Sequence, residues 1–260
     1  MSSEDFLDKK KLKKLDQKMQ VLLDRIGLDR KTQDEVFDKS TLHVLERLIS
    51  NKVLDILDFP ISTGKEGNVF RGVTPENKLV AVKIYRISTA TFKHILKYII
   101  GDPRFQSIHH SKRDIVFAWT KKEFVNLERL NNIGIKSPKP IKMIKNVLVM
   151  EYIGDYEKAA PLMKDVNLKN PEKTFNILLD YISKMYNEAN LVHGDISSYN
   201  VLIYKDEPYL IDLGQAVLLE HPNSQELLKR DIHNLIDSFK KYKIKVDENK
   251  IYNEIINNKK

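Results

Sequence analysis

The stretch His193-Gly194-Asp195-Ile196-Ser197-Ser198-Tyr199-Asn200 is the most informative part of this chain. Its spacing is His-x-Asp, then four residues, then Asn, and Ile211-Asp212-Leu213-Gly214 follows shortly afterwards. Transfer of a phosphoryl group from a nucleotide needs a carboxylate that accepts or orients the attacking proton. It also needs a carboxylate and an amide oxygen that hold metal ions on the phosphates. Asp195, Asn200 and Asp212 supply this set, so the spacing predicts phosphoryl-transfer chemistry.

A glycine-containing loop lies well upstream of these residues. The segment Ser62 to Val69, with sequence STGKEGNV, connects two strand-like stretches within 61–71. Glycine allows backbone N–H groups to approach phosphates closely. An ordinary hairpin turn is the alternative for this segment taken alone, because it lacks a complete GxGxxG and is not a Walker A motif. The loop residues that we expect to contact a nucleotide are Ser62, Thr63, Gly64, Lys65, Glu66, Gly67 and Val69.

A lysine lies in the next predicted strand, over 79–87. The alternation of side chains puts Ala81, Lys83 and Tyr85 on one face and Val80, Val82 and Ile84 on the other. A lysine on a half-buried face needs an anion, although an ammonium group that reaches water is the alternative. Glu123 falls within the apolar stripe of a helix predicted over 114–131. We therefore expect a Lys83–Glu123 pair beside the phosphates, with Glu128 as the alternative partner.

A short apolar strand predicted over 146–152 ends at Gly154 and has the features of a hinge between two lobes. In this interpretation Met150 lies at the back of the adenine pocket. The backbone groups of Glu151 and Ile153 would bond the edge of the purine.

The order of predicted elements indicates a two-lobed α+β protein. Residues 1–30 are charged and helix-prone, and Ser40 is the predicted cap of a second helix. A sheet with one helix follows, and then a mostly helical part. We expect an N-terminal helical extension over 1–50, an N-lobe over 51–152 and a C-lobe over 153–260.

The predicted catalytic part departs from ordinary protein kinases in two ways. Gly194 replaces the arginine of His-Arg-Asp that pairs with a phosphorylated activation loop, so activation of that kind is not expected. Only 48 residues follow Asp212, and they contain no Ala-Pro-Glu string. We therefore expect a truncated C-lobe that selects protein substrates without the usual peptide-docking helices.

The composition is that of a globular protein with an excess of positive charge. Hydrophobic residues make up 42% and charged residues 31%, the net charge is +8, and cysteine is absent, which excludes disulfides and thiolate catalysis. No apolar run reaches the roughly 18 residues of a membrane span, and we expect neither a secretory leader nor a membrane partner, hence cytoplasmic residence. The basic residues cluster at Lys9, Lys10, Lys11, Lys13, Lys14 and Lys18; at Arg104, Lys112, Arg113, Lys121 and Lys122; and at Lys136, Lys139, Lys142 and Lys145. These clusters are either a solvated surface or a contact with RNA.

Taken together, these motifs resemble the RIO family of atypical serine/threonine protein kinases, in the archaeal form of its type-1 branch. The similarity covers roughly residues 40–240. The segments that carry it are STGKEGNVF (62–70), AVKIYR (81–86), GDPRF (101–105), FAWTKKEFVNLERL (117–130), MEYIG (150–154), LVHGDISSYNVL (191–202) and IDLGQAV (211–217).

This resemblance implies a protein-kinase-like RIO fold and a kinase or ATPase that acts in maturation of the small ribosomal subunit. It implies ATP with Mg²⁺ (or Mn²⁺) as cofactors, Asp195 as catalytic aspartate, and Asn200 and Asp212 as metal ligands. It also implies an aspartyl-phosphate intermediate on Asp212, and a flexible loop over about 88–112 in which Ser107 or Ser111 is autophosphorylated. The implied partner is the pre-small ribosomal subunit, both its RNA and its proteins, and no DNA partner is expected.

Two other functions are compatible with these residues. A small-molecule phosphotransferase of the aminoglycoside or choline kinase type also uses His-Gly-Asp-x4-Asn, but the short basic C-terminal part argues against it. A non-catalytic scaffold that binds ATP as a switch is the third option. The presence of Lys83, Asp195, Asn200 and Asp212 argues against that one.

Overall fold

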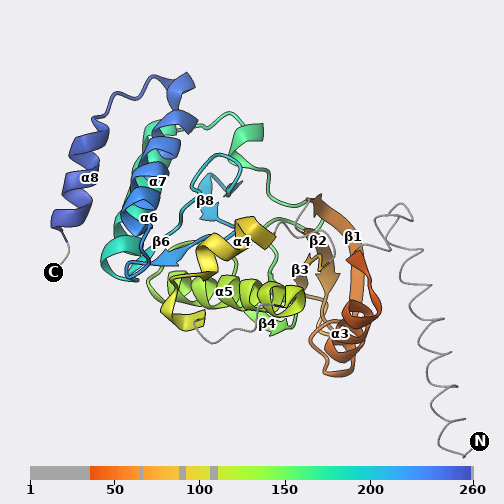
Figure 1. Cartoon of the computed structure of the whole chain (residues 1–260). Helices are drawn as coiled ribbons and strands as arrows, with labels where there is room; N and C mark the ends of the chain where they lie inside the picture. The colour runs from red at the N-terminus through yellow and green to blue at the C-terminus, as the bar shows by residue number, and fades with distance from the viewer. Residues whose placement is uncertain (1–35, 65–66, 88–91, 106–110, 259–260) are drawn as a thin grey trace, which may run out of the picture.

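The computed structural model describes residues 36–64, 67–87, 92–105 and 111–258. The helix expected over residues 1–30 lies outside this part of the chain. The first described element is helix α3, Lys39–Ser50. Five antiparallel strands then form the N-lobe sheet in the order β1-β2-β3-β5-β4 (Figure 1). The strands are β1 (Ile56–Thr63), β2 (Gly67–Val73), β3 (Leu79–Tyr85), β4 (Pro140–Ile144) and β5 (Val147–Glu151).

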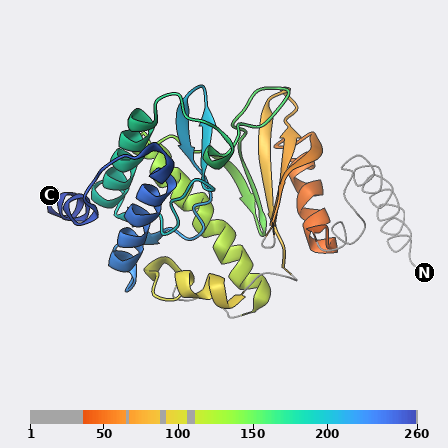
Figure 2. The same cartoon turned by 90° about the horizontal axis from the view of Figure 1, so that it is seen from above.

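Three segments lie between β3 and β4: helix α4 (Phe92–Ile99), the 3₁₀ turn η1 (Pro103–Phe105) and the long helix α5 (Lys112–Asn132). Figure 2 shows α5 running from the N-lobe sheet into the helical C-lobe. The described parts of the segment expected to be a flexible loop, 92–105 and 111–112, contain α4, η1 and the start of α5. The loop was expected there because the family resemblance implies it. The apolar stripe of α4 is only two turns long, which is short for a helix that sequence alone can identify.

The C-lobe consists of helices around two small strand pairs. Its helices are α6 (Pro171–Asn187), α7 (Ser224–Ser238) and α8 (Glu248–Asn257), and its 3₁₀ turns are η2 (Met163–Asp165) and η3 (Lys240–Tyr242). Strands β6 (Leu191–Val192) and β9 (Val217–Leu218) pair, as do β7 (Val201–Tyr204) and β8 (Glu207–Leu210). No helix of the described residues has both the length and the apolar character needed to cross a membrane.

The alternation predicted for β3 divides the interior into two cores. Ala81 and Tyr85 pack into the large core shared with α5 and the C-lobe. Val80, Val82 and Ile84 pack into a second core, which α3 covers through Leu45 and Leu48. Because β3 is apolar on both faces, it lies at the centre of its sheet, and its Lys83 is held toward the C-lobe.

One local prediction needs correction. The N-cap of α3 is Asp38 rather than Ser40, because Asp38 has extended backbone and its Oδ1 accepts the Thr41 N–H at 2.7 Å. Beyond α5, Pro140 begins strand β4, which lies at the edge of the sheet. A proline is tolerated at the first residue of an edge strand, where its missing N–H removes no bond from the ladder.

Candidate active site

A cleft of about 640 Å³ separates the two lobes. β1, β2 and β3 line it from the N-lobe, β5 and the segment after it form the back, and residues near Asn200 and Asp212 line it from the C-lobe. Most of the predicted nucleotide-binding residues are found here: Ser62, Gly64, Gly67, Val69, Lys83, Glu123, Met150, Glu151 and Ile153. Thr63 is exposed at the end of β1 and is not among the lining residues, and Lys65 and Glu66 lie outside the described residues.

The glycine loop comes very close to strand β3. A Cβ atom at position 67 would lie only 2.5 Å from the carbonyl oxygen of Ile84. No side chain fits at that distance, so glycine is required where β2 begins beside β3. This close approach fixes the end of the loop against Ile84 and Tyr85, in the same cleft that Lys83 lines.

Lys83 lies at the centre of a three-residue ion cluster. Its ammonium group donates to Oε1 of Glu123 at 2.8 Å and to Oδ1 of Asp212 at 3.1 Å. The other carboxylate oxygen of Glu123 accepts the hydroxyl of Tyr85. The expected Lys83–Glu123 pair is therefore present, whereas Glu128 is exposed on the opposite side of α5. The cluster joins β3, α5 and the loop after β8.

The pKa values of this cluster follow from burial and mutual attraction. Burial lowers the pKa of Lys83, but the charges of Asp212 and Glu123 outweigh it and raise that pKa well above 10.5. Burial raises the pKa of Asp212, but Lys83 reverses the effect and holds it below 3.8. The carboxyl of Glu123, only 1% exposed, keeps a pKa raised above 4.5 by burial, against the attraction of Lys83. At neutral pH the cluster therefore contains a cationic lysine and an ionised Asp212.

Asp195 and Asn200 contact each other at the C-lobe side. Nδ2 of Asn200 donates to Oδ2 of Asp195 at 2.9 Å, and Nε2 of Gln215 donates to the same oxygen at 3.2 Å. Asn200 and Asp212 line the cleft, whereas Asp195 does not. Among the described residues no group of three or more His, Cys, Asp or Glu side chains is arranged for a metal ion. Mg²⁺ at nucleotides is commonly held by one or two protein oxygens plus phosphates, which Asn200 and Asp212 can supply.

The loop that carries Asp212 has unusual backbone. Asp212 has φ +63°, a left-handed conformation that non-glycine residues rarely adopt outside turns and functional sites. Two residues later the chain passes so close to Trp119 that a Cβ at Gly214 would lie 2.7 Å from the indole ring. The backbone around Asp212 is thus fixed by packing against α5.

Two buried polar side chains of α5 hold the same loop. The ammonium of Lys122, 0% exposed, donates to the carbonyl of Gly214 at 3.0 Å and to that of Ala216. Nδ2 of Asn126 donates to the carbonyls of Leu213 at 2.9 Å and Ala216 at 3.0 Å. Neither residue was identified as part of the site from the sequence. Lys122 was placed in a basic surface cluster because a lysine is almost never fully buried.

The motif GDPRF extends this network. Arg104 forms an ion pair with Asp102 at 2.6 Å and donates to Oδ1 of Asn126 at 2.8 Å. Asp102 is completely buried and the side chain of Arg104 is 17% exposed. Arg104 therefore also belongs to the interior rather than to the basic surface cluster in which the sequence had placed it.

The buried ammonium of Lys122 gives a pH-dependent prediction. Burial lowers its pKa from 10.5 to about 7, so between these values the unfolded chain binds more protons than the folded one. The contribution of Lys122 to the free energy of unfolding therefore rises with pH above 7. We expect the free energy of unfolding of the wild type minus that of Lys122→Met to be flat below pH 7. Above pH 7 it should rise by about 1.4 kcal/mol per pH unit in urea titrations.

The matched control is Lys121→Met, which changes the exposed neighbour on the same helix. Its difference from the wild type should show no such pH trend. A difference for Lys122→Met that stays level from pH 6 to pH 9 would contradict the assignment of a buried, titrating ammonium.

The backbone of the catalytic loop, 193–200, is held by Asp231 of α7. The two oxygens of this buried carboxylate accept the N–H groups of Gly194 at 2.7 Å and Ile196 at 2.9 Å. His193 is 1% exposed, and its Nε2 lies 3.2 Å from the carbonyl of Ile211. Asp231 was not identified from the sequence. The signal that could have found it is its position within the apolar stripe of α7, where a buried acid needs hydrogen-bond donors; the stripe consists of Leu227, Leu228, Ile232 and Leu235.

The hinge offers two backbone groups to a purine. The N–H of Glu151 is engaged, because it donates to the carbonyl of Lys139 at 2.8 Å, so the carbonyl is the backbone group of Glu151 that a purine could contact. The carbonyl of Ile153 accepts the N–H of Ala160 at 2.9 Å, which leaves the N–H of Ile153. One acceptor and one donor beside Met150 match the edge of an adenine.

The two serines predicted as autophosphorylation sites lie in different parts of the chain. Ser107 lies outside the described residues. Ser111 is the N-cap of α5: its Oγ accepts the N–H of Asp114 at 3.2 Å and donates to Oδ2 of Asp114 at 2.5 Å. The hydroxyl is exposed, and its modification stays a prediction.

Comparisons with known proteins agree with these features. The family described as RIO domain matches residues 68–251. A protein named RIO-type serine/threonine-protein kinase Rio1 from Haloferax volcanii is 41% identical over 222 residues, which cover 85% of this chain and 76% of that protein. The protein of the same name from Methanocaldococcus jannaschii is 41% identical over 228 residues, with 87% and 78% covered.

Solved structures share the fold. The Rio2 kinase from Chaetomium thermophilum has a TM-score of 0.65 at 21% identity, over 81% of this chain and 65% of that one. The ADP/Mg2+-phosphoaspartate complex of the same kinase has a TM-score of 0.62 at 20% identity, over 79% and 61%. This chain thus spans a little under two thirds of those solved chains.

Proposed function

Because this chain belongs to the RIO family of serine/threonine protein kinases, in its RIO1 type, we propose that it transfers the γ-phosphoryl group of ATP in the interlobe cleft. The observation that carries the proposal is the position of Lys83 between Glu123 and Asp212, at 2.8 and 3.1 Å. A lysine held by two carboxylates beneath a glycine loop is suited to bind the phosphates of a nucleotide. Ser62, Gly64 and Gly67 above it, and Met150, Glu151 and Ile153 at the back, would contact the rest of ATP.

The residues of the C-lobe side position the acceptor and hold the metal ion in this proposal. Asp195 accepts or orients the proton of the attacking hydroxyl, and the amide of Asn200 holds Asp195 in position at 2.9 Å. Asn200 and Asp212 would supply the oxygens for Mg²⁺ or Mn²⁺. The metal, when bound, neutralises charge on the phosphates.

We also propose Asp212 as the site of an aspartyl-phosphate intermediate. The related Rio2 kinase has been solved as a complex with ADP, Mg²⁺ and phosphoaspartate, and the family resemblance puts the equivalent residue at Asp212. In this step an oxygen of Asp212 bonds to the γ-phosphorus while the bond from that phosphorus to the bridging oxygen breaks and ADP leaves. Hydrolysis by water then returns the carboxylate and releases phosphate. The pKa of Asp212, held below its usual range by Lys83, keeps the nucleophile ionised.

The proposed partner is an immature small ribosomal subunit in the cytoplasm. The resemblance implies it, and the surface charge supports it, because the net charge is +8. Lys112, Arg113, Lys121, Lys136, Lys139, Lys142 and Lys145 of the basic clusters are exposed. Exposed cations of this kind favour contact with RNA phosphates.

One experiment tests the activity and the partner together. Purified protein should hydrolyse ATP in the presence of Mg²⁺ and co-sediment with immature small subunits in sucrose gradients. Co-sedimentation should weaken as salt increases, because contacts with RNA phosphates are salt-dependent. Phosphorylation of choline or an aminoglycoside, without any association with ribosomal particles, would instead support a small-molecule phosphotransferase.

A further inference from the structure

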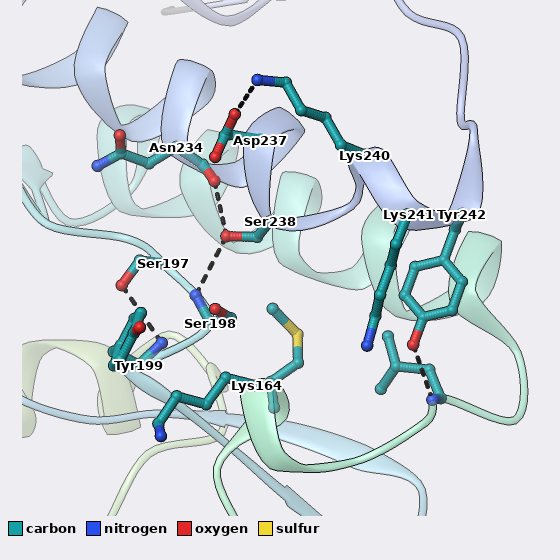
Figure 3. Close-up of a pocket in the computed structure, with 12 residues that line it drawn as sticks. Lys164, Ser197, Ser198, Tyr199, Asn234, Asp237, Ser238, Lys240, Lys241 and Tyr242 are labelled. Atoms are coloured by element: carbon teal, nitrogen blue, oxygen red, sulfur yellow. Dashed lines mark hydrogen bonds and ion pairs between the residues drawn. The ribbon is translucent and has the colours of Figure 1, made fainter.

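A second pocket, of about 520 Å³, lies on the C-lobe side of the catalytic loop. Ser197, Ser198 and Tyr199 of that loop form one wall, and residues of η2, the end of α7 and η3 form the others (Figure 3). We call this cavity the loop pocket. Tyr199 also lines the interlobe cleft, so a single side chain is shared by the two cavities.

The loop pocket is built around the backbone of Ser198. The N–H of Lys164 donates to the carbonyl of Ser198 at 3.1 Å. The N–H of Ser198 donates to Oγ of Ser238 at 3.1 Å, and that hydroxyl donates to the carbonyl of Asn234 at 2.7 Å. A molecule in the pocket would therefore contact the segment between Asp195 and Asn200 directly.

The charge of the loop pocket is positive. Three lysines line it, and two of them have carboxylate partners: Lys164 pairs with Asp165 at 3.1 Å, and Lys240 pairs with Asp237, so Lys241 supplies the excess positive charge. Figure 3 shows Lys240 turned toward Asp237, while Lys241 extends toward the loop after η2, where its Nζ lies 3.5 Å from the carbonyl of Val166. Among the described residues no carboxylate forms an ion pair with Lys241.

The chain around Lys241 is rich in lysine. The run 240–245 has the sequence KKYKIK, with four lysines and no acid. All four lysines are exposed, and two of them, Lys240 and Lys241, line the pocket. Salt screens the attraction between exposed charges only beyond roughly 8 to 10 Å.

The pocket also has apolar surface. Met163, Leu168 and Tyr242 line it, and the N–H of Leu168 donates to the hydroxyl of Tyr242 at 3.0 Å, which fixes that ring. Apolar walls, serine hydroxyls and a cation together suit the side chains of a peptide. A phosphate backbone would leave the apolar walls unused.

We propose that the loop pocket binds acidic side chains of the protein acceptor, so that the enzyme selects serine or threonine residues within acidic segments. The inference rests on the proposed phosphoryl transfer and names the substrate class of the same site. Because the pocket adjoins the loop that carries Asp195, and an extended chain advances about 3.3 Å per residue, an acid a few positions from the acceptor hydroxyl can reach Lys241.

Two fluorescein-labelled peptides test the proposal: a serine flanked by glutamates, and the same peptide with alanines in their place. Binding to the full chain is measured by anisotropy, and phosphorylation is measured as kcat/KM. The acidic peptide should bind and react about ten-fold better than the neutral one, and this ratio should fall with salt. Lys241→Glu should reduce the ratio to about one or below, and a lysine-flanked peptide should then be preferred. Lys241→Met should give an intermediate ratio, which covers the case in which charge reversal disturbs folding.

The matched control is Lys78→Glu, which makes the same charge change at an exposed position just before β3 in the N-lobe, and it should keep the wild-type ratio. Equal affinity of the wild type for both peptides would overturn the proposal. Competition by an RNA oligonucleotide would also overturn it. If the RNA displaced the acidic peptide from the wild type but not from Lys241→Glu, the pocket would be a nucleic-acid site. Peptide binding is read without turnover, so failure of the proposed phosphoryl transfer would be seen separately, as no ATP turnover in the wild type.

Discussion

Replacing Asp195 with asparagine is expected to lower the turnover of ATP by about 10³-fold, while the KM for ATP changes little. The reason is that asparagine keeps the shape of the side chain but cannot take a proton. Its oxygen can still accept the hydrogen bond from Nδ2 of Asn200, which lies 2.9 Å from Asp195 Oδ2 in the wild type. General base catalysis by one positioned carboxylate contributes roughly 10² to 10⁴-fold. The measurement is release of ADP in steady state, with nucleotide affinity determined separately by titration.

The control for this experiment is Asp180→Asn, which removes an exposed carboxylate that pairs with Lys184 in α6. It should leave turnover within about two-fold of the wild type, as is usual for surface positions. Full turnover by Asp195→Asn would mean that another group accepts the proton. Equal loss of ATP binding would instead point to a role for Asp195 in holding the nucleotide.

The second large effect is expected at Lys83. Lys83→Met should lower affinity for ATP by about 100-fold, because a charge-assisted contact to phosphate contributes roughly 1.5 to 3 kcal/mol. It should also lower the free energy of unfolding by about 3 kcal/mol at pH 8, since the buried carboxylate of Glu123 loses its partner at 2.8 Å. Isothermal titration with nucleotide and urea denaturation measure the two effects independently.

The loss of stability in Lys83→Met should depend on pH with a definite sign. The pKa of Glu123 is already raised by burial, and removal of Lys83 raises it further. In the window above its ordinary value of 4.5, the folded state then binds more protons than the unfolded state, so stability falls as pH rises. The variant should therefore be closer to the wild type at pH 5 than at pH 8.

A double variant separates structure from nucleotide binding. Lys83→Met combined with Glu123→Gln removes the unpaired charge and should recover most of the lost stability. It should not recover affinity for ATP, because no cation has returned to the cleft. Recovery of both properties would show that Lys83 acts only as the counter-charge of Glu123.

Much of the site could be predicted because its signals are periodic or fixed in spacing. The alternation around Lys83 identified its face correctly. Because β3 lies between two apolar cores, successive side chains must point alternately into one core and the other. The apolar stripe of α5 identified Glu123 as inward, and a buried acid needs a partner. The Asp195–Asn200 spacing brought these two side chains into contact.

The missed features depend on contacts between distant parts of the chain. Nothing in its local sequence distinguishes Lys122 from the exposed Lys121 beside it, because burial is decided by the loop at 213–216 that packs there. Capping of α3 by Asp38 rather than Ser40 depends on the backbone conformation of a single residue. The free energies of two alternative helix caps differ by about 1 kcal/mol or less, which sequence patterns do not resolve.

Helix α5 contacts both halves of the enzyme through residues that lie within about one turn of each other. Glu123 holds the lysine of β3, while Lys122 and Asn126 hold the backbone beyond Asp212. An outward movement of this helix, which inactivates many phosphotransferases, would break both sets of bonds. It would leave a buried ammonium and a buried carboxylate without partners. The resting enzyme is therefore expected to be competent before any signal arrives. The rate of phosphoryl transfer is then expected to depend on the access of ATP and acceptor to the cleft and on the release of products, rather than on assembly of the catalytic groups.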